Sequence, residues 1–251
     1  MSIVKTVKVE RPPYAHNWVR YNHPTVPETT KALVSFIMGA PQITYVAGMP
    51  IIRDRIVLGL DRATALRAAA TKGHKKSQPY VSKFVEAFLD YDEVRQYSGL
   101  PAYDQYVAPY QINRDIRIPV KPLVVISEGG VLKPIFVVGW ATMPLTLFQR
   151  QLLMTVLEDA VFSLTDFQNS PGEFLSFPHL KGSNSAQRTP LIWKRGDYGL
   201  LSATRMKEQA ETYLEALASA KAIIAEKQKA KAKQQPSDTP DEASIQTELD
   251  V

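Results

Sequence analysis

Two apolar segments separated by a pair of glycines constrain the fold of this chain most strongly. Residues 122–127 read PLVVIS, a run that predicts a strand buried on both faces. Gly129 and Gly130 follow, and they predict a tight turn because glycine adopts positive φ at no steric cost. Residues 131–140 are again apolar and are expected to return as the partner strand. The sequence therefore predicts an antiparallel hairpin at the centre of the fold.

A long apolar helix is expected to follow this hairpin. Pro144 suits the first turn of a helix, and the pattern continues to Leu164. Most of the polar side chains gather into one stripe on a helical wheel, whereas most of the remaining surface is apolar. The helix should therefore be covered on more than one side. Residues 118–164 are predicted to form two adjacent antiparallel strands with a helix packed on their sheet.

Other segments show helical or strand periodicity. Helices are expected at residues 28–38, 61–72, 78–89 and 202–233, the second of them capped by Asp61. Short strands are expected at residues 43–46, 51–58, 112–118, 190–194 and 198–201. Residues 10–27, rich in Pro, His, Asn and Tyr, are expected to be irregular.

This order of elements predicts an α+β fold. Its mainly antiparallel sheet should be centred on the hairpin and packed by the long buried helix, with a second long helix at the C-terminus. Residues 1–27 are expected to form an N-terminal arm, and residues 28–235 a single domain. Residues 236–251 carry five acids and no base and are predicted to be a disordered acidic tail.

The C-terminal helix carries an apolar seam with a 4-3-4-3-4 spacing, formed by Met206, Ala210, Tyr213, Leu217, Ala220 and Ile224. Covering its own domain is the first interpretation, because most helices gain stability by burying an apolar stripe internally. Self-association through this helix is the alternative, so a homo-oligomer is a second expectation.

Composition excludes some classes of function. The chain has no cysteine, which excludes disulfides, thiolate metal sites and cysteine catalysis. It also lacks an apolar run long enough to span a bilayer, so no membrane partner is expected, and a cytoplasmic location is the default. The formal net charge of the chain is +5. It is the sum of about +10 on residues 1–235 and about −5 on the acidic tail, residues 236–251. A basic body favours nucleic acid or acidic partners.

Catalytic chemistry is hard to find in the central unit. A hairpin followed by a helix is also the layout of the PD-(D/E)xK nuclease core, which needs an acid at the start of the first strand and an acid-x-Lys on the second. The first position here is Pro122-Leu123, and the second strand ends Val138-Gly139-Trp140-Ala141. The motif is absent, so the chain is not assigned to that family. No catalytic residue is predicted, and an enzyme of unfamiliar type ranks third among the functions considered.

Metal-binding patterns are weak as well. Glu158 and Asp159 are adjacent on the long helix, where neighbouring side chains diverge by about 100°. An interpretation in which they join Asp115 or Glu128 around a metal is less favoured than a polar helix edge bonded to arginine or backbone. His16 and His23 lack a third ligand of suitable spacing. No metal and no cofactor are therefore predicted.

Two surface features suggest partners. The densest positive segment is the candidate nucleic-acid site, formed by Arg62, Arg67, Lys72, Lys75, Lys76 and Lys83. A tyrosine-rich stretch is the candidate protein interface, formed by Tyr91, Tyr97, Tyr103, Tyr106 and Tyr110. A solvated helix face and packing of a loop, respectively, are the plainer interpretations of these two features.

The first functional hypothesis is a non-enzymatic binding or accessory protein whose partner is another protein. The alternative is a non-specific nucleic-acid-binding protein, which includes a catalytically inactive nuclease-like fold.

Overall fold

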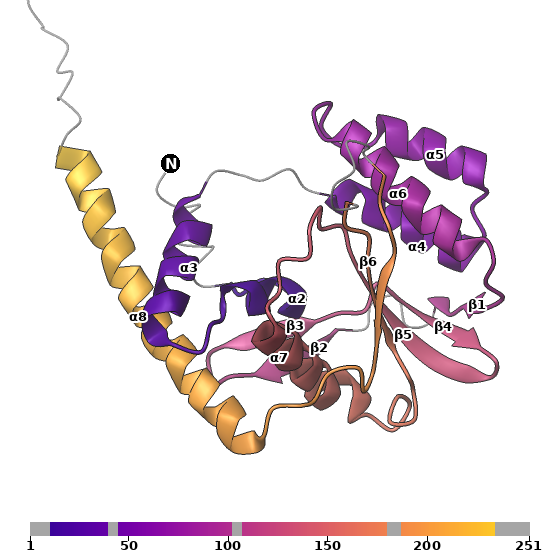
Figure 1. Cartoon of the computed structure of the whole chain (residues 1–251). Coiled ribbons are helices and arrows are strands. Elements are labelled where there is room, and N and C mark those ends of the chain that lie inside the picture. The colour runs from indigo at the N-terminus through magenta and orange to yellow at the C-terminus, as the bar shows by residue number, and fades with distance from the viewer. Residues whose placement is uncertain (1–10, 40–44, 102–106, 180–186, 234–251) are drawn as a thin grey trace, which may run out of the picture.

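The computed structural model describes residues 11–39, 45–101, 107–179 and 187–233, with side chains described as far as residue 230 (Figure 1). Its helices are α2 (Ala15–Trp18), η1 (Val19–Tyr21), α3 (Val26–Met38), η2 (Val46–Gly48), α4 (Met49–Leu58), α5 (Arg62–Thr71), α6 (Gln78–Asp92), α7 (Leu147–Leu157), η4 (Glu158–Phe162) and α8 (Ala203–Lys233). Its strands are β1 (Ser98–Gly99), β2 (Ala108–Gln111), β3 (Arg117–Val120), β4 (Val124–Glu128), β5 (Val131–Val138), β6 (Glu173–Ser176) and β7 (Leu191–Lys194). The fold is α+β, as predicted. The predicted tail, residues 236–251, lies outside the described residues.

The main sheet has five strands in the order β1-β4-β5-β6-β7. The predicted hairpin is confirmed: β4 and β5 pair antiparallel, with Val124 opposite Ile135, and Gly129 and Gly130 turn the chain at φ 60° and 77°. The β1–β4 and β6–β7 pairs are also antiparallel, whereas β5 and β6 are parallel and are joined through α7. Strands β2 and β3 form a separate antiparallel pair. The sheet is therefore mainly antiparallel, with one parallel pair at its centre.

Successive strand residues enter two different cores. Val125 and Phe136 face a core that contains α7, α8 and the N-terminal helices. Val124 and Ile135 face a second core, formed by α4, α5 and α6. Figure 1 shows α4–α6 grouped at one side of the molecule and α8 lying alongside α3 at the other. The sheet is thus buried on both faces, as its continuous apolar runs predict.

Helix α7 packs on the hairpin as expected, and it begins slightly later than Pro144. Thr146 caps it: the Thr146 hydroxyl accepts a hydrogen bond from the backbone N–H of Gln149, and the Gln149 side chain bonds the backbone of Thr146 in return. Leu152, Leu153 and Val156 are fully buried. After Leu157 the helix widens into the π-helical turn η4.

The apolar seam of α8 covers its own domain, which confirms the first interpretation. Tyr213, Leu217, Ala220 and Ile224 are buried, and the helix packs along α3. Self-association through α8 stays a prediction. Among the described residues, no helix combines the length and the hydrophobicity needed to cross a membrane.

Two strand predictions, at residues 51–58 and 198–201, are wrong. Of residues 112–118, only Arg117 and Ile118 lie in a strand, at the start of β3. Residues 43–46 lie partly outside the described residues, and Val46 belongs to η2. Residues 51–58 form most of helix α4, which has Pro50 in its first turn and ends at Gly59 with φ 68°. Its β-branched residues Ile51, Ile52, Ile56 and Val57 favour a strand, but proline at the start and a left-handed glycine at the end are helix signals. Residues 198–201 are not a strand either. Part of the segment expected to be irregular, Ala15–Trp18, is helical.

Candidate ligand-binding pocket

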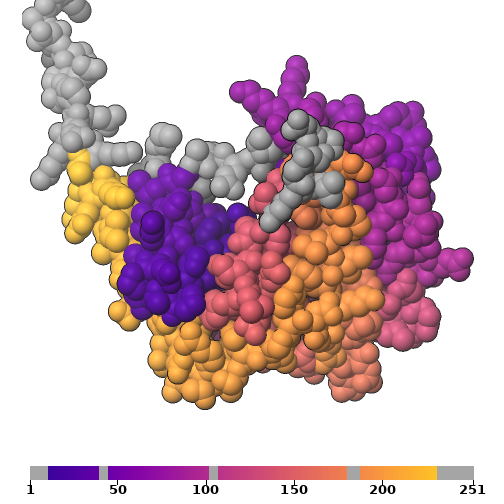
Figure 2. All heavy atoms as spheres, viewed as in Figure 1, coloured from indigo at the N-terminus to yellow at the C-terminus, as the bar shows by residue number. Residues whose placement is uncertain are grey.

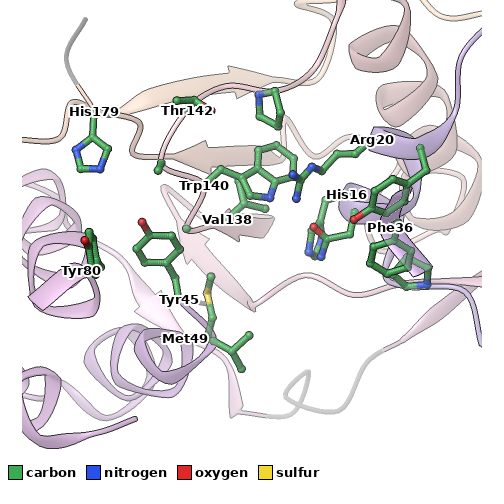
Figure 3. Close-up of a pocket in the computed structure, with 17 residues that line it drawn as sticks. His16, Arg20, Phe36, Tyr45, Met49, Tyr80, Val138, Trp140, Thr142 and His179 are labelled. Carbon is green, nitrogen blue, oxygen red and sulfur yellow. The ribbon is translucent and has the colours of Figure 1, made fainter. Parts of the chain in front are cut away.

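A pocket of about 640 Å³ opens beside the carboxyl ends of the parallel strands β5 and β6. In open sheets, ligands often bind where chain segments diverge beyond such strand ends. Figure 3 shows Trp140 in the middle of this pocket, with Arg20, His16 and Phe36 on one side and Tyr45, Tyr80 and His179 on the other. The pocket is thus lined by residues from widely separated parts of the sequence. In the space-filling view, the N-terminal helices and α4–α6 occupy opposite sides of the molecule, with later segments between them (Figure 2).

The N-terminal wall of the pocket is held in place by α7. The buried Gln149 amide Nε2 donates to the backbone oxygens of Arg20, at 3.1 Å, and Asn22, at 3.0 Å. The Asn22 amide in turn donates to the backbone oxygen of Trp18, at 2.8 Å. Because Gln149 also belongs to the capping box of α7, the start of that helix fixes η1. This arrangement positions Arg20 and His16 against the sheet.

Trp140, directly beyond β5, carries the aromatic centre of the pocket. The Arg20 guanidinium lies 5.5 Å from the Trp140 ring centre and 6.0 Å from that of Tyr21. The His16 ring centre is 6.2 Å from Trp140. Trp140 is half-buried, whereas the two other tryptophans, Trp18 and Trp193, are only 2% and 3% exposed. Trp140 is therefore the tryptophan best placed to meet a ligand.

Tyr45 forms the opposite wall and rests directly on Gly139. A Cβ atom added to Gly139 would lie only 2.3 Å from the Cβ of Tyr45, so no larger residue fits there without displacing the tyrosine. On its other side the Tyr45 ring meets Phe84 edge-on, with 5.8 Å between ring centres. The absence of a side chain at Gly139 therefore brings Tyr45 close to the strand end.

The electrostatic character of the pocket is positive. Among the described residues that line it, none is an aspartate or a glutamate. Desolvation, together with the charge of Arg20, lowers the pKa of His16 to about 4. Burial and the neighbouring Arg188 also lower the pKa of His179. Both histidines are thus neutral at pH 7 and offer hydrogen-bond donors and acceptors, while Arg20 supplies the positive charge of the lining.

A basic loop stands next to the pocket. The segment between α5 and α6 packs against η2, since a Cβ atom on Gly73 would lie 3.0 Å from the Cβ of Ala47. Tyr45 and Val46, which flank this contact, line the pocket. Lys72, Lys75 and Lys76 of the loop are exposed, and no described acid forms a salt bridge with them. The loop that carries half of the predicted nucleic-acid residues therefore contacts the segment that forms one wall of the pocket, although none of the three lysines lines the pocket itself.

The other three predicted basic residues have partners on their own helical unit. Arg62 forms salt bridges with Asp90 and Glu93, at 2.7 and 3.0 Å. Lys83 pairs with Glu86 at 2.8 Å, and Arg67 donates to the hydroxyl of Thr64 at 3.2 Å. These three side chains are therefore not part of the group of lysines that lacks salt bridges to described acids.

The predicted interface tyrosines differ in their burial and in the partners of their hydroxyl groups. Tyr91 and Tyr97 are half-buried, and their hydroxyls donate to Glu173, at 3.1 Å, and to Asp92, at 2.6 Å. Tyr110 is only 9% exposed, and burial with the nearby Asp159 raises its pKa to about 12. Tyr103 and Tyr106 lie outside the described residues. A protein interface at this stretch stays a prediction.

An ionic cluster occupies the other end of the sheet, at the β4–β5 turn. Arg95 binds Glu128 and Glu173, both at 2.9 Å, and Lys133 also binds Glu128. The hydrogen bonds from Arg95 and Lys133 lower the pKa of Glu128 to about 2. Tyr91 completes the cluster by donating to Glu173. Every charged group of this cluster has a partner of opposite charge.

The weak metal candidates do not converge. Within the described ranges, no group of three or more His, Asp or Glu side chains is arranged to hold a metal ion. Arg195 binds both carboxylate oxygens of Glu158, which confirms the arginine-bonded interpretation for that residue. Glu128 belongs to the ionic cluster, and Asp115 lies in an exposed turn after Asn113.

The chain gave no match to protein-family models, to curated proteins or to solved structures. The positions at which a PD-(D/E)xK core carries its acids are Leu123, before β4, and the second hairpin strand, whose end Val138–Ala141 lines the pocket. At these positions the chain has apolar and aromatic residues.

Sequence reasoning missed this pocket because its residues are far apart in the chain. Arg20, Tyr45, Trp140 and His179 come from four separate segments, and no short motif links them. One signal was available: Trp140 follows directly on a strand buried on both faces, and a large aromatic residue just beyond such a strand end is a candidate for ligand contact.

Proposed function

We propose that this protein binds single-stranded nucleic acid without catalysing a reaction, and that it does so in the cytoplasm. The observation that carries the proposal is an aromatic pocket with Arg20 and no acid in its lining, standing beside three exposed lysines. Aromatic rings accept any base by stacking, and positive side chains bind the phosphates regardless of sequence.

The proposal assigns different tasks to the two parts of this surface. Trp140 and Tyr45 would stack against an unpaired base, with Arg20 at the edge of the same pocket. Lys72, Lys75 and Lys76 would contact the backbone on either side of that base. The volume of about 640 Å³ lies within the range of small-molecule sites, roughly 300–1,000 Å³.

Single strands are favoured over duplexes because of the shape of the site. A base in a duplex is stacked and paired, so it reaches a pocket only after it is flipped out at a cost of a few kcal/mol. An unpaired base avoids most of that cost. The apolar positions where the nuclease core needs acids support binding without cleavage.

Fluorescence anisotropy of a labelled oligothymidylate at low salt tests the proposal, with a duplex of equal length beside it. We expect the single strand to bind more tightly. Changing Trp140 to Ala should weaken binding about tenfold, because one base stack contributes about 1–3 kcal/mol. Changing Lys72, Lys75 and Lys76 to Ala should reduce the slope of log K against log salt by about 2.

A matched control removes three positive charges elsewhere. Lys207, Lys221 and Lys227 are exposed on α8, which does not line the pocket. Changing these three to Ala alters the net charge equally and should change the affinity far less. If the wild-type protein does not retain the single strand even at low salt, or if both triple variants lose the same affinity, the proposed site is wrong.

A further inference from the structure

Arg188 lies directly behind the pocket and is only 6% exposed. Its backbone forms a β-bridge with His179, which lines the pocket. Its Nη1 donates to the backbone oxygens of Phe177, at 2.7 Å, and Trp140, at 3.4 Å. The guanidinium therefore connects the two chain segments that leave β5 and β6 and open the pocket.

The other two nitrogens of this guanidinium lack a hydrogen-bond acceptor among the described residues. Nε and Nη2 of Arg188 are buried and donate to no described group. No described carboxylate forms a salt bridge with Arg188. The centre of the guanidinium lies 4.5 Å from the ring centre of Tyr45 and 5.8 Å from that of Phe84, and its interaction with the Tyr45 side chain acts to raise the pKa of Arg188. Aromatic side chains, and no described carboxylate, therefore surround this cation. A buried cation without a counter-charge is costly.

A purely structural role does not account for this arrangement well. Binding two backbone carbonyls requires only a neutral donor such as an amide. Burial lowers the pKa of Arg188, but arginine stays charged at neutral pH because its ordinary pKa is so high. The chain thus keeps a full positive charge in a place of low dielectric, separated from the pocket by the ring of Tyr45. There the charge acts more strongly than it would in water.

We infer that Arg188 is a specificity-determining residue, which makes the pocket select a nucleotide, carrying its phosphate, over the corresponding nucleoside. The inference rests on the proposed function and adds that the pocket binds one nucleotide, its base and its phosphate together. Arg20 in the lining and Arg188 behind Tyr45 together provide two positive charges for one phosphate, and no acid of the lining opposes them.

The test compares adenosine with adenosine monophosphate by calorimetry, with the change in intrinsic tryptophan fluorescence as a second measurement. We expect the wild-type protein to bind the monophosphate about tenfold more tightly than adenosine, the order of effect expected for charges several ångströms apart at the effective dielectric of a protein. Arg188→Gln should lose most of this preference, measured as the ratio of the two affinities within the same variant. Arg188→Lys should keep most of it. Arg114→Gln, at an exposed position, is the control with the same change in net charge.

The possible results separate the inference from the proposed function. Equal wild-type affinities for adenosine and its monophosphate overturn the inference, and so does a folded Arg188→Gln that keeps the preference. If neither small ligand binds although the oligothymidylate does, the inference fails and the proposed function stands. If the oligothymidylate does not bind either, the proposed function fails. If Arg188→Gln does not fold, the inference is tested by two other measurements: the ratio of the wild-type affinities for the monophosphate and for adenosine, and the same ratio in Arg188→Lys.

Discussion

The arginines at the two ends of the central sheet have different kinds of partner. At the β4–β5 turn, Arg95 and Lys133 are both bound by carboxylates. At the other end, Arg20 and Arg188 meet aromatic rings and backbone oxygens instead of acids. Both ends bury arginine, but only one supplies its counter-charges. The paired end is explained by stability, whereas at the unpaired end we propose that a bound phosphate supplies the counter-charge.

The sheet shared by the two ends should be the most sensitive part of the molecule. Val125 is completely buried between the hairpin and α7. Changing Val125 to Asp places an unpaired charge there, which costs several kcal/mol, about the whole stability of an ordinary domain. We expect the cooperative melting transition to disappear. The control is Val131→Asp at a position that is 41% exposed, and it should melt normally. A cooperative transition in Val125→Asp would contradict the hairpin–helix core.

Removing the central arginine of the paired end should cost about 3–5 kcal/mol of stability, because Arg95→Met leaves Glu128 and Glu173 without it. Chemical denaturation measures this loss. Arg62→Met, which breaks two exposed pairs, should cost only about 0–1 kcal/mol. A clearly smaller loss of stability in Arg188→Gln, at the unpaired end, than in Arg95→Met would support the difference between the two sheet ends. Equal losses in the two variants would contradict it.

Acid should weaken the paired end within a defined pH window. The pKa of Glu128 falls from its ordinary value of 4.5 to about 2 in the folded protein. Its stabilising contribution is therefore complete above about pH 4.5 and is lost as the pH falls towards 2. Denaturation curves measured between these values should show a smaller decrease in Glu128→Gln than in the wild type. Glu208→Gln, at an exposed partner of Arg205, should leave the decrease unchanged.

Introducing a carboxylate side chain at the unpaired end should weaken nucleic-acid binding and leave the free energy of unfolding nearly unchanged. Thr142 is exposed and lines the pocket, so Thr142→Glu should shift the free energy of unfolding by no more than about 0.5 kcal/mol. Oligothymidylate binding should weaken about tenfold, because the new carboxylate opposes the phosphates. Thr142→Gln has nearly the same shape and no charge, and it should bind like the wild type. Equal binding by the two variants would show that charge at this end does not matter.

Much of the fold could be predicted from local patterns. The hairpin follows from two apolar runs around Gly129 and Gly130, and α5 follows from its cap, Asp61, whose side chain accepts from the N–H of Thr64 at 2.9 Å. The misread helix α4 shows the limit of such patterns. Its β-branched residues suggested a strand, but the buried set Ile51, Ile52 and Ile56 belongs to one helical face that packs on α6. Tertiary contacts decided between two local preferences of similar strength.

The candidate site was predictable only in part. Lys72, Lys75 and Lys76 were identified because they are neighbours in sequence. The pocket itself depends on contacts between distant segments, such as the Gln149 amide that holds the backbone of Arg20. The short strand β6, which forms the parallel pair with β5, falls in a stretch where no strand was predicted. Without that pair, the strand ends that open the pocket could not be located.

The close contact between Gly139 and Tyr45 has a consequence for how this pocket can evolve. A Cβ atom at position 139 would lie only 2.3 Å from the Cβ atom of Tyr45, and every residue except glycine carries a Cβ atom. A shorter side chain at position 45 therefore does not make room for a larger residue at position 139 unless the backbone moves. The size of the pocket can change through the ring at position 45, whereas in an alignment of relatives we expect glycine at position 139.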